Sequence, residues 1–99
     1  MRHHTRHTIR EALTATEAIA HAALSHLHLL RYTLTRAANT GHTLRISYVK
    51  EDGTATVRDI APSEVRRSKA GDWYVRAHDH LRDAARSFRL DRIANLETA

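Results

Sequence analysis

The side chains best suited to bind an anion lie near the C-terminal end of the chain, where arginines surround an aromatic residue. Arg86 and Arg89 flank Phe88, and Arg92 follows three residues after Arg89. If Phe88 faces the core, the two-residue period of a strand turns Arg89 outward. Guanidinium groups bind phosphate and carboxylate oxygens through a planar fork of donors. The spacing is compatible with an anion site in which Arg89 and Arg92 converge with Arg76 or His78, but by itself it favours the alternative, a solvated surface on which Asp91 and Arg92 form only an exposed ion pair.

The preceding segment places an aromatic ring beside a cation on one predicted strand. Tyr74 and Arg76 lie two residues apart and share one face, whereas Trp73 and Val75 share the opposite face. A tyrosine can stack on a nucleic-acid base while a neighbouring arginine holds the phosphate. We therefore predict Tyr74 and Arg76 as ligand contacts, the alternative for Tyr74 being a half-buried ring with a locally bonded hydroxyl. The opposite face is predicted to be core, formed by Trp73, Val75, Phe88 and Leu90.

Histidines are numerous, nine in 99 residues, and two of them follow the predicted binding strand. His78 and His80 share a face if that strand extends to residue 80, and their protonation below about pH 6.5 would strengthen anion binding. His3 and His7 are spaced like a metal-binding pair on a helix, but no carboxylate completes a set of three ligands and the HExxH motif is absent. We predict no structural or catalytic metal, only adventitious metal binding by His3, His4 and His7.

Composition narrows the classes of function further. The chain carries sixteen Lys and Arg against eleven Asp and Glu, a formal charge of +5, and fourteen of the sixteen are arginines. This charge suits a polyanionic partner, although GC-rich codons alone also favour arginine over lysine. The sequence contains no cysteine, no glycine-rich phosphate loop and no nucleophile elbow, so neither an enzyme nor a bound cofactor is predicted. No apolar run reaches the roughly 18 residues of a membrane span, and we expect a cytoplasmic protein without membrane contact.

The N-terminal part of the chain is typical of a long amphipathic helix, because residues 6–38 contain neither glycine nor proline. Thr5 or Thr8 is the predicted N-cap, and Asn39 with Gly41 gives the stop signal. Apolar residues recur at three- and four-residue steps, interrupted only at Thr16: Ile9, Leu13, Ala20, Ala23, Leu27, Leu30, Leu34 and Ala37. The sequence therefore predicts one helix with a wide apolar stripe.

The length of this helix raises the question of what covers its apolar stripe. A continuous helix over residues 6–38 would span about 50 Å, well beyond the roughly 20–25 Å width of a barrel built from the remaining residues. Either the helix breaks near Ser25 and His26 and folds back, or its N-terminal half packs on a second copy of the chain. We predict the second arrangement, a homodimer held by its N-terminal helices.

After Gly41 the pattern changes from the helical period to the period of two that is typical of strands. The predicted strands are Leu44–Tyr48, Thr54–Ile60, Glu64–Ser68, Trp73–His78 and Arg86–Leu90, with a helical turn at Asp91–Leu96. Pro62 is predicted to end the second strand, since proline cannot donate a ladder hydrogen bond. Five short antiparallel strands favour a small closed barrel, so we predict an α+β protein with a helical segment at 1–40 and a β-barrel domain at 41–99.

These elements resemble those of the WYL domain, a module of bacterial transcription regulators and defence-associated proteins. The matching segments occur in the family's order: Ile46–Tyr48, Asp52–Gly53, Arg58–Pro62, Trp73–Val75 and Ser87–Ile93. Val75 stands where the family's name has leucine, and the chain has room for neither an N-terminal winged helix-turn-helix nor a C-terminal extension. The resemblance implies an Sm-like, SH3-type barrel that senses a nucleic acid or nucleotide-like ligand, with Phe88–Arg92 contributing to the pocket.

The residues and the resemblance together predict a non-enzymatic, WYL-type ligand-sensing module that regulates transcription or phage defence through a protein partner. Its predicted ligand is single-stranded nucleic acid or a nucleotide-like anion. The predicted binding residues are Tyr74, Arg76, His78, His80, Arg86, Arg89 and Arg92. Four further strand arginines could extend a basic surface, but each alone is better explained as a solvated strand residue: Arg45, Arg58, Arg66 and Arg67. The alternative is a structural protein whose helix drives assembly and whose barrel binds a protein partner.

Overall fold

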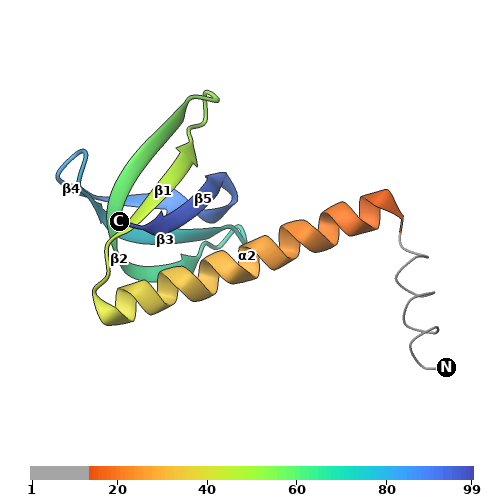
Figure 1. The fold of residues 1–99 in the computed structure, drawn as a ribbon, viewed down its shortest axis with the longest axis horizontal. Helices are drawn as coiled ribbons and strands as arrows, with labels where there is room; N and C mark the ends of the chain where they lie inside the picture. The colour runs from red at the N-terminus through yellow and green to blue at the C-terminus, as the bar shows by residue number, and fades with distance from the viewer. Residues whose placement is uncertain (1–13) are drawn as a thin grey trace.

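The computed structural model describes residues 14–99, which form one long helix followed by a five-stranded antiparallel sheet (Figure 1). The elements are helix α2 (Ala15–Thr40), strands β1 (Leu44–Val49), β2 (Ala55–Arg67), β3 (Trp73–Asp79) and β4 (Ala84–Arg89), the 3-10 helix η1 (Leu90–Arg92) and strand β5 (Ile93–Thr98). The strand order is β4-β3-β2-β1-β5, and every neighbouring pair is antiparallel. The predicted α+β class with five antiparallel strands is confirmed, and the domain boundary between residues 40 and 41 stays a prediction.

Both ends of α2 are set by capping residues. Thr14 has extended dihedral angles (φ −71°, ψ 161°), and its Oγ1 accepts a hydrogen bond from the backbone N–H of Glu17 at 3.1 Å. Gly41 adopts the left-handed conformation at φ 72° and donates its N–H back into the last turn. The predicted stop at Gly41 is confirmed, whereas the prediction of a helix running unbroken through position 14 is wrong. The predicted N-caps Thr5 and Thr8 lie outside the described residues.

The helix continues past Ser25 and His26, so the alternative of a break at these residues is wrong (Figure 1). Its C-terminal half packs on the sheet through three buried residues, Leu30, Leu34 and Ala37. Residues 15–26, which we call the helix arm, are all exposed, with Ile19 70% and Leu24 52% exposed. The N-terminal part of the arm extends beyond the sheet, whereas Nε2 of His26 at its C-terminal end lies 3.2 Å from the carbonyl oxygen of Ile93 in β5 (Figure 1). In the part of the chain that the structure describes, no helix is both long and apolar enough to cross a membrane.

Strand β2 contains two of the predicted strands, because Pro62 lies inside it rather than after it. The first half of β2 pairs with β1 and the second half with β3, so one bent strand serves both halves of the sheet. The register with β3 shifts between Pro62 and Glu64, which marks a β-bulge, and Oγ of Ser63 donates to the carbonyl of Arg76 at 2.9 Å. A bulge is one of the few places where a strand tolerates the missing N–H of proline. The predicted strand end at Pro62 is therefore wrong.

The sheet is curled, but it does not close into the predicted barrel. In the described part of the chain, the edge strands β4 and β5 are not paired with each other. The turn η1 carries the chain from one edge strand to the other, and its Leu90 is fully buried in the core. The predicted helical turn at Asp91–Leu96 is wrong beyond Arg92, because Ile93–Thr98 pairs with β1 as strand β5.

The core lies between α2 and the inner face of the curled sheet. Its buried members are Leu30, Leu34, Ala37, Leu44, Ile46, Ile60, Val75, Ala77, Phe88, Leu90 and Ile93. The predicted core residues Val75, Phe88 and Leu90 are confirmed, whereas Trp73 is only partly buried and packs at the edge of the core. Burial alternates along β3, and this alternation decides whether each predicted site residue points inward or outward.

Candidate anion-binding pocket

A small pocket opens where β1, β2, β4 and η1 come together. Its volume is about 180 Å³, and its lining residues are Tyr48, Lys50, Glu51, Arg58, Arg86, Ser87, Phe88 and Arg92. Four of these residues are basic and one is acidic. We call this site the basic pocket.

The register of the strands explains why these side chains converge. Phe88 and Arg86 both pair with buried residues of β3, so both belong to the inner face of β4. On β2, Arg58 lies two residues before the buried Ile60 and shares its face. Tyr48 of β1 packs edge to face against Phe88, with the ring centroids 5.1 Å apart. The curl of the sheet thus brings residues of three strands to one opening.

A buried ion pair holds one wall of the basic pocket. Arg58 is 3% exposed and Asp79 is 0% exposed, and Nη1 of Arg58 donates to Oδ2 of Asp79. Oδ1 of Asp79 accepts a hydrogen bond from the backbone N–H of Leu81 at 3.0 Å. Nε of Arg58 is buried and has no hydrogen-bond partner among residues 14–99. Because a buried charge is stable only when it is paired, Asp79 fixes Arg58 in the wall of the pocket.

The hydroxyl of Tyr48 fixes β4 beside this wall. It accepts a hydrogen bond from the backbone N–H of Arg89 at 3.2 Å, while the ring packs on Phe88. We expect Tyr48→Phe to lower the free energy of unfolding by about 0.5–1.5 kcal/mol, because the N–H loses its acceptor while the ring still fills its place. Urea denaturation measures the change, with Tyr32→Phe as the control because Tyr32 is 64% exposed. An unfolding midpoint for Tyr48→Phe equal to that of the wild type would contradict this role.

Two of the predicted site residues, Arg86 and Arg92, lie in the basic pocket. The ion pairs found among the described residues include neither of them, nor Lys50. Arg58 is neutralised by its buried partner, so three positive charges face the single negative charge of Glu51. A concave site with an excess of positive charge attracts anions and concentrates them.

Three other predicted residues, Tyr74, Arg76 and His78, lie on the outer face of β3, where they alternate with buried residues. Nη1 of Arg76 lies 3.3 Å from Oγ of Ser87, and Ser87 lines the basic pocket. Arg76 therefore contacts one lining residue from the outer face of the sheet, opposite the face that carries Arg86 and Phe88, and it does not itself line the pocket.

Arg89 also faces outward, as predicted, but two carboxylates hold it there. Its Nη2 lies 2.7 Å from Oδ2 of Asp91 and 3.3 Å from Oδ1 of Asp72. The hydrogen bond with Asp91 raises the pKa of Arg89 above its ordinary value. Asp91, which the sequence suggested as a partner of Arg92, thus pairs with Arg89 instead. The structure places Arg89 opposite Tyr74 in the ladder between β3 and β4, outside the residues that line the basic pocket.

The predicted histidines His78 and His80 contact each other at the end of β3, with ring centroids 5.1 Å apart. Nε2 of His78 lies 3.1 Å from Oδ1 of Asp83, and the backbone N–H of His80 donates to the carbonyl of Asp59 at 3.0 Å. Neither histidine lines the basic pocket. Among residues 14–99, no three His, Asp or Glu side chains gather closely enough to hold a metal ion. The histidines predicted to bind metal adventitiously, His3, His4 and His7, lie outside the described residues.

The sequence reasoning missed the central place of Arg58 and the contributions of Tyr48 and Lys50. Its interpretation of Arg58 as a solvated strand residue is wrong, because the side chain is 3% exposed. A signal was present in the spacing. Arg58 lies two residues before Ile60, and Asp79 follows the core residues of its strand at the same interval. The strand period therefore assigns both charged residues to inner faces, where they need each other as partners.

Comparison with protein families gives a match to the WYL domain over residues 30–98, which is more than two thirds of the chain. The chain belongs to the WYL domain family. The match includes the half of α2 that packs on the sheet, and it includes every residue that lines the basic pocket of this WYL-domain protein. No curated protein matches the chain.

Among solved structures, proteasome accessory factor B/C (PafBC) of Arthrobacter aurescens is similar to the WYL-domain protein. The TM-score is 0.66 and the sequence identity is 30%. The match covers 73% of this chain and 11% of the PafBC chain. The WYL-domain protein thus corresponds to a small part of that larger protein.

Proposed function

We propose that this WYL-domain protein is a non-enzymatic regulatory module that binds single-stranded nucleic acid or a nucleotide-like anion in the basic pocket. The observation that carries the proposal is the placement of Arg86 and Arg92, which line the pocket and have no carboxylate partner among residues 14–99. Arginine binds phosphate oxygens through charge-assisted, bidentate hydrogen bonds. A role in transcription or phage defence further requires a protein partner that responds to the ligand.

The size of the basic pocket decides which part of the ligand enters it. About 180 Å³ is smaller than the roughly 300–1,000 Å³ of sites that enclose a small molecule, so the pocket takes a phosphate group while sugar and base stay outside. Arg76 lies just across β4, and Tyr74 is two residues away on the same outer face. A strand that leaves the pocket around the edge strand β4 reaches this outer face, where it meets a cation and then an aromatic ring, the combination that binds single strands without sequence preference.

Arg86→Ala is expected to weaken binding of a short single-stranded oligonucleotide about tenfold, because one charge-assisted contact to phosphate is lost. Fluorescence anisotropy titrations at several salt concentrations measure this effect. The affinity of the wild-type protein should fall as salt rises, and the slope of log affinity against log salt concentration should be near −0.7 for each neutralised phosphate. Arg86→Ala should make this slope less steep by about 0.7, the contribution of one phosphate contact. The thermal unfolding midpoint should stay unchanged, because Arg86 is exposed.

Arg45→Ala is the matched control for this titration. Arg45 is an exposed strand arginine outside the pocket, and its Nε lies 2.8 Å from Oδ1 of Asp59. Wild-type affinity in the Arg86→Ala protein, or an equal loss in the Arg45→Ala protein, would contradict the proposed site. If no oligonucleotide or nucleotide binds while the chain still assembles, the structural alternative is correct.

We also propose that the protein forms a homodimer through the helix arm. Ile19 is 70% exposed and Leu24 is 52% exposed on this arm. An apolar notch of about 550 Å³ lies where the arm leaves the sheet, lined by Ala20, Ala23, Leu24, His26, Leu27, Leu30, Leu90 and Asp91. Contiguous exposed apolar surface of this kind usually marks an interface. Twofold pairing of two arms would bury the same surface on both copies.

A further inference from the structure

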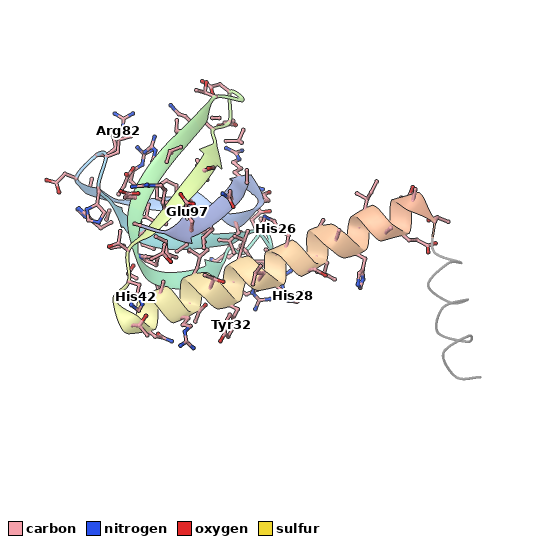
Figure 2. The ribbon with its side chains drawn as sticks, viewed as in Figure 1. His26, His28, Tyr32, His42, Arg82 and Glu97 are labelled. Carbon is pink, nitrogen blue, oxygen red and sulfur yellow. The ribbon has the colours of Figure 1, made fainter. Side chains whose placement is uncertain are left out.

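A second hollow, separate from the basic pocket, lies between α2 and the β2–β3 part of the sheet. Its volume is about 850 Å³, and its wall on α2 includes His28, Arg31, Tyr32, Arg36 and Asn39, while Trp73 contributes from the sheet. The helix residues recur at three- and four-residue steps, so they form one face of α2. Figure 2 shows His28 and Tyr32 along the same lower edge of the helix. We call this hollow the helix groove, and it shares no lining residue with the basic pocket.

The wall that the sheet contributes to the helix groove is an aromatic ring with guanidinium groups over it. Cζ of Arg31 lies 3.7 Å from the ring centroid of Trp73, and Cζ of Arg67 lies 5.5 Å from it. Nε of Arg67 donates to the carbonyl of Gly71 at 3.1 Å, which holds that side chain beside the ring. The cation–π contact with Trp73 restrains Arg31 in the same way. The groove therefore presents a cation whose position is set before any ligand arrives.

Charge and aromatic surface in the helix groove match a nucleotide. Arg31 and Arg36 both line it, no acidic residue does so in the described part of the chain, and neither arginine takes part in an ion pair there. Tyr32 is 64% exposed and precedes Arg36 by one helical turn, so a base on the tyrosine ring places its phosphate near the guanidinium. The amide of Asn39 can both donate to and accept from a base edge.

We propose that the helix groove is a second ligand site, which takes an aromatic base linked to a phosphate, with the base on Tyr32 and the phosphate on Arg36 and Arg31. The volume of about 850 Å³ falls within the roughly 300–1,000 Å³ typical of small-molecule sites. The groove is built from α2 and Trp73 and does not depend on the basic pocket. A free mononucleotide and one unit of a single strand share this chemistry, and the probes of the test separate them.

Trp73 is the only tryptophan of the chain, so its indole N–H gives a single NMR signal that reports on the helix groove. The full-length protein is titrated with adenosine monophosphate, with a single-stranded adenine oligonucleotide and with inorganic phosphate. We expect a saturable shift of the Trp73 signal with a nucleotide probe, and weaker binding of inorganic phosphate because it lacks the base. Saturation by adenosine monophosphate identifies a free nucleotide as the ligand, and saturation only by the oligonucleotide identifies a strand.

Tyr32→Ala and Arg36→Ala should each weaken this titration about tenfold, through loss of base stacking and of a phosphate contact respectively. Both side chains are exposed, so the fold should persist. The control is Arg82→Ala. Arg82 lies in the turn between β3 and β4, far from His28 and Tyr32 in Figure 2, so this variant should bind the nucleotide probes like the wild type. In an Arg86→Ala background the Trp73 shift should persist, whether or not the basic pocket binds a ligand.

Four results would overturn the proposal for the helix groove. In the first two, the Trp73 signal would not move with any of the three probes, or it would respond as strongly to inorganic phosphate as to a nucleotide. In the other two, the Arg82→Ala protein would lose as much affinity as the Arg36→Ala protein, or the Trp73 shift would disappear in the Arg86→Ala background. If no ligand binds in the basic pocket, the Trp73 titration should be unchanged, so the two sites are tested separately.

Discussion

Asp79→Ala is expected to lower the free energy of unfolding by about 3–5 kcal/mol, because the substitution leaves the charge of Arg58 buried without its partner. Asp79 is 0% exposed and accepts hydrogen bonds from both Arg58 and the backbone N–H of Leu81. Its loss also leaves the N–H of Leu81 without an acceptor. Urea denaturation of the wild type and the variant measures the difference, and the slope of the transition shows whether unfolding remains two-state.

A double replacement separates the charge from the packing. Arg58→Met combined with Asp79→Leu should recover much of the lost stability, because apolar residues of similar volume remove both buried charges together. The control is Asp59→Ala, which breaks the exposed pair with Arg45 and should change the unfolding midpoint little, since solvent screens such pairs. An Asp79→Ala protein as stable as the wild type would show that the buried pair does not hold the pocket wall.

Replacing Ile19 and Leu24 together with glutamate is expected to convert a homodimer into a monomer. Both side chains are exposed on the helix arm, where they would lie in the proposed interface between two copies. Four charges forced into one apolar interface cannot be solvated there, and their burial costs more than the interface gains. Light scattering on the full chain at micromolar concentration should show a mass of two chains for the wild type and of one chain for the variant.

Leu81→Glu is the matched control for the dimer, because Leu81 is 63% exposed but lies in the turn between β3 and β4. This variant should remain a dimer. A wild-type protein that is monomeric under these conditions would contradict the assignment of the helix arm as an interface. Dissociation of the Leu81→Glu protein would place the interface elsewhere.

Local signals in the sequence predict the elements whose ends depend on nearby residues. Gly41 ends α2 through its own positive φ, and the alternation of Leu44, Ile46 and Tyr48 predicts β1. The strands that sequence reasoning divided differently depend on distant partners. Pro62 is tolerated inside β2 because a bulge against β3 accepts it. Residues 93–98 lack a regular apolar alternation and become β5 only through pairing with β1.

The pairing of the arginines in the candidate site also depends on residues distant in the sequence. Sequence spacing identified the region of Arg86 and Arg92, and the strand period assigns Arg58 to an inner face, but spacing does not show which arginines are paired with acidic residues. The partner of Arg58 lies 21 positions away, and one of the two acids that hold Arg89 lies 17 positions away. Which arginines keep an uncompensated charge therefore depends on tertiary contacts, and these contacts place Arg89 outside the pocket and Arg58 in its wall.

NMR mapping of a bound single strand on the full chain tests the basic pocket most directly. We expect the signals of Tyr48, Arg86, Ser87 and Arg92 to shift and to saturate together as a short oligonucleotide is added, with the shifts of Arg86 and Arg92 side chains the largest. These four residues line the pocket, and their response should disappear in the Arg86→Ala, Arg92→Ala double variant. Saturable binding of the oligonucleotide that leaves all four signals unmoved would contradict the basic pocket as the ligand site.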